Sequence, residues 1–426
     1  MISALLFLTA GAGLFFLLLN RLVIRLKDSK LKKCLIALTG LSLTVGPALC
    51  GYRVEDSGWR LLPILVLAGF LAGELRRAVL RRRCRGTPPI EWQNVRIALT
   101  RPCTTTALMV TRYAIQRPDW HGRRLRIAHL SDLHVSDQYP AAFYAEIISR
   151  IHAAAPDLLF ITGDFVSEAH FAPRLPAILT PLTARYRTFG VLGNHDYWAG
   201  AEEIAQVVRA AGVHLLGNAC HQIRHDGRQP LLIYGDEAPW GAAHPPIENA
   251  PPDALRLALT HTPDNIYRLN ADGAHAVFAG HYHAGQFRLP YLGAIVIPSA
   301  YGRRFDHGHF LVQGTHLFVT SGIGGGTPLR LYCPPDIFII DVSHVTHHPP
   351  QSPRERGEAL SGTNTVRTNV SPRLRGEQGG WVRNVNDVSC GSDPTGFPKP
   401  VGSEVMVFNP AFGDGTNSRP RRLLLR

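Results

Sequence analysis

The stretch AGHYHAGQ, residues 279–286, places His281 and His283 one residue apart between two glycines. Imidazole is a common metal ligand, but a lone histidine pair is more often a core or loop feature, so its meaning depends on partners elsewhere in the chain. Suitable partners recur in four segments upstream. They are Asp132 and His134 in SDLH, Asp164 in TGDF, Asn194, His195 and Asp196 in GNHD, and His261 in THTPD.

Each of these segments closes a run of apolar residues that predicts a β-strand. The runs alternate with helix-compatible stretches near residues 140–155, 172–184 and 201–211. This order predicts an α/β fold with a largely parallel core sheet. Because ligands gather at the carboxyl ends of parallel strands, we expect the five segments to meet at one edge of the fold. Three glycines within the motifs suit sharp turns or a close backbone approach: Gly163, Gly193 and Gly280.

The mixture of donor atoms indicates which metals would bind. Aspartate oxygens and histidine nitrogens without a thiolate suit Mn, Fe or Zn, whereas Mg and Ca prefer oxygen ligands throughout. The motifs hold more donors than one ion needs. Two ions about 3.5 to 4 Å apart, bridged by one carboxylate, would use them all, and such pairs serve displacement reactions at phosphorus.

The ordered set D-x-H, G-D, G-N-H-D, H and G-H-x-H resembles the motif series of the calcineurin-like metallophosphoesterase family. The resemblance covers roughly residues 120–342 and implies a four-layer α/β/β/α sandwich. Within the family, the chain is most similar to the bacterial membrane-associated branch, in which a glycine-rich, arginine-containing segment follows the last motif, here residues 320–342. That branch reads GHTHGGQ where this chain has Tyr282 and Ala284, a change that we expect to alter pocket shape rather than metal binding.

The resemblance also implies a role for each motif residue. The first metal is expected on Asp132, His134, Asp164 and His283. The second is expected on Asn194, His261 and His281, with Asp164 bridging the two. A hydroxide held between the ions would be the nucleophile, and His195, oriented by Asp196, would act as general acid or transition-state stabiliser at the leaving group. Asn194 and Arg330 are expected to contact the substrate, although Arg330 could equally pair with a carboxylate inside the fold.

The net charge of +13 is concentrated at the two ends of the chain. Residues 1–100 hold 15 Lys and Arg against 5 Asp and Glu, and residues 349–426 hold 11 against 7. Residues 101–348 hold 19 against 20 and contain no lysine. A basic groove for nucleic acid is therefore not expected. The seven cysteines lack C-x-x-C spacing, which argues against a disulfide framework or a zinc ribbon.

Three apolar runs precede the motifs. Residues 2–19 form an uncharged run of 18 residues, which is long enough to cross a bilayer as a helix. The run at 34–52 contains Pro47. The run at 61–72 has only 12 residues, so it could form either a short membrane span or a helix that lies in the membrane interface. Basic clusters follow the first and third runs, so the positive-inside rule predicts three crossings and a cytoplasmic catalytic domain, whereas two crossings would place the site outside.

These patterns divide the chain into four regions. We predict a membrane anchor of two to three transmembrane helices at 1–85, a linker with a lead-in strand at 86–122 and the catalytic domain at 123–345. Residues 346–426 are rich in Pro, Gly, Ser, Asn and Arg, a composition typical of a disordered tail.

The resulting prediction is a multi-pass protein of the inner membrane that hydrolyses a phosphoester or pyrophosphate with two metal ions. Confinement to a membrane favours substrates in the same plane, such as a lipid-linked pyrophosphate of the UDP-diacylglucosamine type. Two alternatives share the fold: a catalytically silent scaffold that binds a protein partner, and a nuclease. The intact ligand set opposes the scaffold and the lysine-free middle region opposes the nuclease. The oligomeric state is not predicted.

Overall fold

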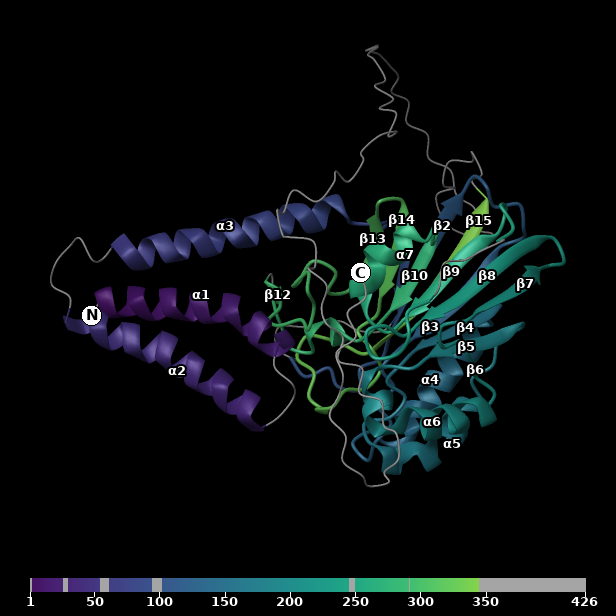
Figure 1. Ribbon diagram of the computed structural model, residues 1–426, viewed down its shortest axis with the longest axis horizontal. Coiled ribbons are helices and arrows are strands. Elements are labelled where there is room, and N and C mark those ends of the chain that lie inside the picture. Colours follow the sequence, from purple (N-terminus) through teal and green to yellow (C-terminus); the bar gives the residue numbers. More distant parts are fainter. Residues whose placement is uncertain are drawn as a thin grey trace, which may run out of the picture. The chain divides into compact units, whose positions relative to one another are not determined.

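A computed structural model describes most of the chain up to residue 344 (Figure 1). The described residues are 2–25, 30–53, 61–93, 102–244, 250–290 and 292–344. The predicted tail at 346–426 lies outside them, as does part of the predicted linker, residues 94–101.

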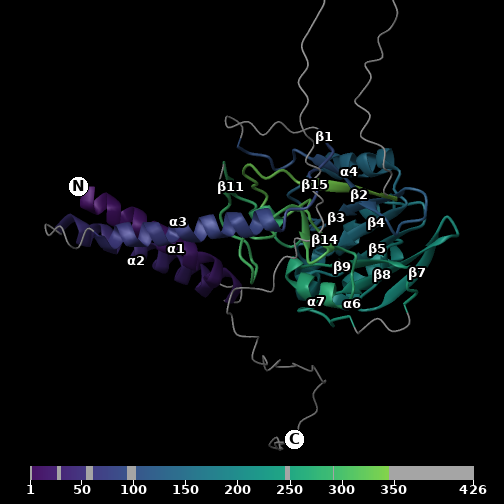
Figure 2. The same ribbon diagram turned by 90° about the horizontal axis from the view of Figure 1, so that it is seen from above.

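Each of the three N-terminal apolar runs forms a long helix. These are α1 (Ile2–Arg25), α2 (Lys30–Arg53) and α3 (Leu61–Arg83). α1 packs against both α2 and α3 (Figures 1 and 2). None of the described helices combines the length and the apolar character that crossing a membrane requires, so the predicted transmembrane helices are not confirmed.

The first sheet has seven strands in the order β1-β2-β15-β3-β4-β5-β6. Strands β3 to β6 are parallel, as the sequence predicts. The last described strand, β15, lies between β2 and β3, parallel to β2 and antiparallel to β3. The strands are β1 (Glu91–Gln93), β2 (Met109–Arg117), β3 (Leu125–Leu130), β4 (Leu158–Thr162), β5 (Arg187–Val191), β6 (His214–Leu215) and β15 (Asp336–His344).

The second sheet has six strands in the order β13-β14-β10-β9-β8-β7. Its four central strands are parallel and its two edge strands are antiparallel to their neighbours. The strands are β7 (Cys220–His225), β8 (Gln229–Asp236), β9 (Leu255–Thr260), β10 (Ala276–Ala279), β13 (Gly308–Val312) and β14 (Thr315–Val319). A two-stranded ribbon, β11 (Arg288–Leu289) and β12 (Gly293–Ala294), stands apart from both sheets.

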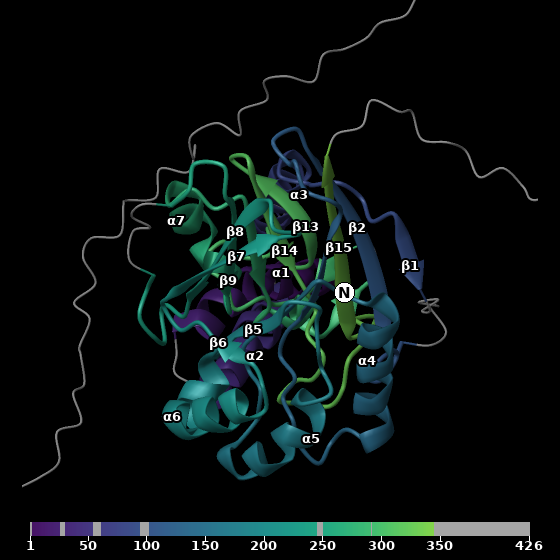
Figure 3. The same cartoon turned by 90° about the vertical axis from the view of Figure 1, so that its right-hand side faces the viewer.

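The two sheets pack face to face, and alternation along the strands decides which side chains meet. In β4, Leu158 and Phe160 point into the core between the sheets, while Leu159 and Ile161 point to the helices on the other face. Helices α4, α5 and α6 cover that face, and α7 contacts β13 of the second sheet (Figures 1 and 3). These helices are α4 (Ala141–Ala154), α5 (Leu175–Leu179), α6 (Asn194–Ala210) and α7 (Ile266–Ala271).

This mixed α/β arrangement agrees with the predicted sandwich, but two helices differ from their expected limits. The helix predicted at 172–184 is a 3-10 turn followed by the short α5. The helix predicted at 201–211 begins at Asn194, because Asp196 accepts the backbone N–H of the N-cap residue Gly193. Gly200, with φ of 114°, interrupts that helix.

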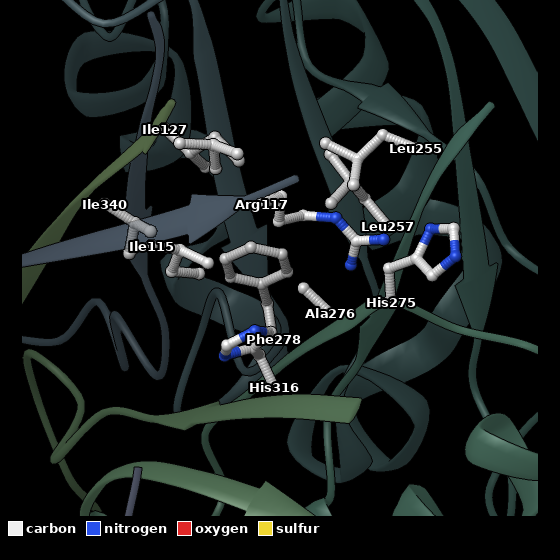
Figure 4. A pocket seen from close by; sticks show the side chains of 11 residues that line it. Ile115, Arg117, Ile127, Leu255, Leu257, His275, Ala276, Phe278, His316 and Ile340 are labelled. Carbon is white, nitrogen blue, oxygen red and sulfur yellow. The ribbon is translucent and has the colours of Figure 1, made fainter. Parts of the chain in front are cut away.

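The end of the sandwich at the amino ends of β9 and β10 is closely packed. Figure 4 shows a cavity there, lined by side chains that include Leu255, His275 and Phe278. Its volume of about 10 Å³ is close to that of a single water position. The motifs lie at the opposite end, after the carboxyl ends of the same strands.

A substitution of Phe278 in β10 tests how far the two-sheet sandwich depends on the core between its sheets. The ring centroid of Phe278 lies 4.8 Å from that of Phe160 and 5.5 Å from that of Phe318. We expect Phe278→Ala to lower the free energy of unfolding by about 3 to 5 kcal/mol, measured by urea denaturation. Leu311→Ala, at a side chain that is 41% exposed, should change it by less than about 1 kcal/mol. Equal losses in the two variants would contradict this assignment of the core.

Candidate metal centre

The ends of five strands bring the predicted ligands together. Strands β3, β4 and β5 of the first sheet and β9 and β10 of the second each lead into one motif. Two clusters of donor atoms result, and within each cluster the atoms lie within 4.8 Å of one another. The first cluster is Asp132, His134, Asp164 and His283; the second is Asp164, His261 and His281.

Asp164 belongs to both clusters, so one carboxylate joins them. Asn194 extends the second cluster, since its Oδ1 lies 3.1 Å from Nε2 of His261. The structure thus gathers all seven predicted metal ligands at one place. Nε2 of His134 is buried and faces Oδ2 of Asp164 at 3.3 Å without a hydrogen-bond partner.

An unusually large share of the predicted ligand residues have left-handed backbone angles. Five of the seven have a positive φ: Asp132 (54°), His134 (43°), Asp164 (54°), His281 (65°) and His283 (47°). Only a few per cent of non-glycine residues adopt such angles. Strain of this kind persists where the surrounding structure over-determines it, and it concentrates at functional sites.

Glycines in the motifs allow strands of the two sheets to approach each other at the site. A Cβ on Gly193 would overlap the carboxylate of Asp164, and one on Gly280 would overlap Ser131 and the carboxylate of Asp132. Next to Gly280, the backbone N–H of His281 donates to Oδ2 of Asp132 at 3.0 Å. Gly280 is therefore required because the Asp132 loop lies directly against the backbone of the histidine motif.

Buried charge defines the electrostatics of the centre. Asp132 and Asp164 are almost completely buried, and burial raises the pKa of Asp132. Burial also acts on Asp164, but the imidazoles of His261 and His134 outweigh it and hold its pKa well below the usual range. Burial lowers and the two carboxylates raise the pKa of His261, with a net rise to about 9. The two buried carboxylates thus favour positive charge beside them. A divalent cation bound there could take the place of the extra proton on His261.

Neighbouring groups fix the orientation of the ligands. Nδ1 of His261 lies 2.7 Å from the carbonyl oxygen of Thr162, so it donates there and leaves Nε2 for an ion. A backbone acceptor for the second ring nitrogen is the usual support of a metal-binding histidine. The backbone N–H of His195 donates to Oδ1 of Asp164 at 2.8 Å and holds that carboxylate in position.

The side chain of His195 lies beside the first cluster, with its ring centroid 4.6 Å from that of His134. Burial lowers the pKa of His195, which favours the neutral imidazole near pH 7. The prediction that Asp196 orients this ring is wrong. Its carboxylate instead accepts backbone N–H groups of Phe165 (2.8 Å), Val166 (3.3 Å) and Gly193 (2.9 Å), and so ties the loop after β4 to the start of α6.

Arg330 also differs from its predicted position. The residue is fully buried, so its guanidinium is not open to solvent, and among the residues that the structure describes it pairs with no carboxylate. Nη1 donates to the carbonyl oxygen of Ser321 at 2.9 Å, and Nη2 donates to that of Gly324 and lies 3.4 Å from Nδ1 of His283. Through these contacts, Arg330 holds the glycine-rich segment and His283 in position.

Tyr282 lies between the two histidines of the last motif and is 1% exposed. Its hydroxyl donates to Oδ1 of Asp264 at 2.6 Å, and Ser299 donates to the same oxygen at 2.6 Å. The side chain is thus held by the loop after β9 rather than by the ligand clusters. It links that loop to residues near 299.

Two tryptophans flank the histidines of the site. Trp198 is 63% exposed, with its ring centroid 4.9 Å from that of His195, and the Trp240 ring lies 4.9 Å from that of His281. Trp240 lies in an irregular segment after β8. No motif marks it, and only the fold brings it to the site.

Gly280→Ala tests the close approach at the histidine motif. The added methyl group must displace the Asp132 carboxylate, so we expect affinity for Mn²⁺ to fall about 10- to 100-fold, as measured by titration calorimetry. The melting temperature of the metal-free protein reports on folding separately. Gly326→Ala, at a position with open space around it, is the matched control and should bind Mn²⁺ normally. Wild-type affinity in Gly280→Ala would contradict the described packing.

Comparisons with known proteins match the part of the chain that carries these motifs. Residues 125–285 match the family model described as calcineurin-like phosphoesterase. Phosphodiesterase YaeI of Escherichia coli (strain K12) is 29% identical over 223 residues, which cover 51% of this chain and 82% of that protein.

Two further relatives cover a similar part of the chain. The uncharacterized metallophosphoesterase YkuE of Bacillus subtilis (strain 168) is 27% identical over 225 residues, covering 50% of this chain and 77% of that protein. UDP-2,3-diacylglucosamine pyrophosphatase LpxG of Chlamydia muridarum (strain MoPn / Nigg) is 26% identical over 292 residues, covering 53% and 88%.

Proposed function

We propose, for a chain that belongs to the calcineurin-like phosphoesterase family through residues 125–285, that it hydrolyses a lipid-linked pyrophosphate or phosphodiester with two divalent metal ions. The protein is a metal-dependent phosphoester or pyrophosphate hydrolase, in keeping with that family and with its relatives. The observation that carries the two-metal proposal is the pair of donor clusters that share Asp164.

The donor atoms assign the ligands. In this proposal, Asp132, His134, Asp164 and His283 hold one ion, and Asp164, Asn194, His261 and His281 hold the other. The mixture of oxygen and nitrogen donors favours Mn, Fe or Zn. Bound ions would lower the pKa of a water molecule and offset negative charge on the phosphoryl oxygens.

The protein's own side chains orient the leaving group and deliver a proton to its oxygen. Hydrolysis joins a water oxygen to phosphorus, breaks the bond between phosphorus and the leaving-group oxygen, and leaves one proton on that oxygen. His195 lies beside the first cluster with Nδ1 3.5 Å from the carbonyl oxygen of Ser167, so its Nε2 is the nitrogen assigned to the leaving group. With its pKa lowered, the ring is neutral near pH 7 and keeps its proton on Nδ1; in this proposal Nε2 takes up the proton that the attacking water loses and delivers it to the leaving-group oxygen.

Two observations support a lipid-linked substrate. UDP-2,3-diacylglucosamine pyrophosphatase LpxG is among the relatives, at 26% identity. The N-terminal helices also carry many exposed large apolar side chains, and a concentration of such side chains is typical of a surface that binds a partner or a membrane. Examples are Leu5 (61%), Leu38 (54%), Leu41 (59%), Leu65 (67%) and Leu71 (64%).

We therefore propose that α1, α2 and α3 anchor the enzyme to the inner membrane with the catalytic domain on the cytoplasmic side. The basic clusters after the first and third apolar runs support this orientation. A reporter fused after residue 90 tests it directly, since reporter activity in the periplasm would contradict a cytoplasmic domain.

The alternative of a catalytically silent scaffold has less support. Every predicted ligand position holds a side chain able to bind a metal, and the clusters have the proximity that catalysis needs. A nuclease is disfavoured by the near-neutral middle region.

Asp164→Asn is the decisive variant, because one substitution weakens both clusters. The purified full chain, with Mn²⁺ added or chelated, is assayed on bis-p-nitrophenyl phosphate, p-nitrophenyl phosphate and UDP-2,3-diacylglucosamine. We expect metal-dependent turnover that falls at least about 100-fold in Asp164→Asn, and fewer than the two bound ions per chain that elemental analysis should find in the wild type.

Asp119→Asn provides the matched control, since the side chain of Asp119 is 57% exposed and pairs with Arg117. Its turnover should equal that of the wild type. Two bound ions without turnover on any substrate would favour the scaffold, and a single ion with full activity would overturn the two-metal proposal.

In this proposal, the exposed ring of Trp198 beside His195 contacts the leaving group. We expect Trp198→Ala to raise KM for UDP-2,3-diacylglucosamine about 2- to 10-fold with little change in kcat, since an aromatic contact contributes about 0.5 to 1.5 kcal/mol. Trp198→Phe should retain most of the affinity. A fall in kcat without a change in KM would instead place Trp198 in control of His195.

A further inference from the structure

An arginine-rich cavity lies where the C-terminal end of α3 meets the segment that follows the histidine motif. We call it the arginine pocket. Its volume is about 320 Å³. The charged residues that line it are Arg77, Arg81, Arg82, Arg85, Arg288 and Asp306.

The pocket carries an excess of positive charge. Asp306 is the one acidic residue among the described residues that line it, and it is shared between two arginines. Arg81 pairs with Asp306, and Nη1 of Arg288 lies 3.0 Å from Oδ2 of the same carboxylate. Arg77 is bound to Glu74 at 2.9 Å on its own helix.

Arg82 and Arg85 have no such partner: within the part of the chain that the structure describes, neither guanidinium pairs with a carboxylate. Cations at the end of a helix interact favourably with the helix dipole, which gives Arg81 and Arg82 a structural reason to be there. That reason does not extend to Arg85, which lies beyond the helix, or to Arg288, which comes from another segment.

The pocket is also a defined part of the fold rather than a loose surface patch. Nη2 of Arg81 donates to the carbonyl oxygen of His307 at 3.4 Å, and its guanidinium lies 5.3 Å from the ring centroid of Phe310. Arg303 pairs with Glu74 of α3 and donates to the carbonyl oxygen of Ala294 at 2.9 Å. These contacts hold α3 against residues 294–310.

We infer that the arginine pocket binds a phosphate group outside the metal centre. Guanidinium groups recognise phosphate oxygens with paired, charge-assisted hydrogen bonds. The volume lies at the lower end of ligand cavities, about 300 to 1,000 Å³, and suits a headgroup rather than a large molecule. The bearer of the phosphate is either a soluble anion or an anionic lipid, whose apolar part would meet the exposed Leu71 and Leu75 of α3.

The experiment measures binding, so it does not depend on the proposed catalytic function. The full chain in a nonionic detergent is treated with a chelator to suppress phosphate binding at the metal centre. Calorimetric titrations then use inorganic phosphate, dihexanoyl phosphatidylglycerol and zwitterionic dihexanoyl phosphatidylcholine.

The test variant is R82E/R85E and the matched control is R76E/R83E, which makes the same charge change at exposed positions of α3 outside the pocket. We expect affinity for the phosphate ligand to fall at least about tenfold in R82E/R85E and less than about twofold in the control. R82Q/R85Q gives the same comparison without charge reversal, and melting curves verify that each variant is folded.

Binding of inorganic phosphate that R82E/R85E abolishes would identify a soluble anion as the occupant. Binding of phosphatidylglycerol but not of phosphate, with the same dependence, would identify a lipid headgroup. No binding of either probe, or equal losses in the test and control variants, would overturn the inference.

Discussion

The buried carboxylate of Asp164 is the interaction on which the rest of the centre depends. It faces His134 and His261 at 3.3 Å each and accepts the backbone N–H of His195 at 2.8 Å, so elements of both sheets meet at one negative charge. A carboxylate in this environment is stable only beside positive charge. The surrounding imidazoles can meet that need through protons, and metal ions bound in the same geometry would meet it as well. Asp196 strengthens the arrangement, because it binds the backbone of the loop that carries Asp164.

The strained backbone at the ligand residues is held in place by the packed strands that lead into it. Five ligand residues occupy left-handed backbone angles, each of which costs of order 1 to 3 kcal/mol. The strands that lead into them are almost entirely buried, and the aromatic core around Phe160 and Phe278 lies between the two sheets. A rigid double sheet can therefore hold loops in angles that they would not adopt alone. The ligands lie in short loops, yet the sheet positions beneath them determine where they point.

The sequence predicts those features that depend on local pattern. Strands β3, β4 and β5, helix α4 and the convergence of the strand ends follow from apolar periodicity and from the geometry of parallel sheets. Features set by distant contacts were not predictable. Neither the burial of Arg330 nor the approach of Trp240 to His281 has a local signal, because each depends on segments far apart in the chain. Asp196 was misassigned because its proximity in sequence to His195 does not reveal that its carboxylate turns toward the backbone.

The position of β15 bears on how the protein is made. This strand, residues Asp336–His344, fills the middle of the first sheet between β2 and β3, although more than 200 residues separate it from them in the sequence. During synthesis, which proceeds at about 5 to 20 residues per second, β2 and β3 must wait tens of seconds with unpaired edges before their shared neighbour leaves the ribosome. Unpaired strand edges are sites of aggregation. Protection of the nascent chain over this interval is therefore a requirement that the topology itself imposes.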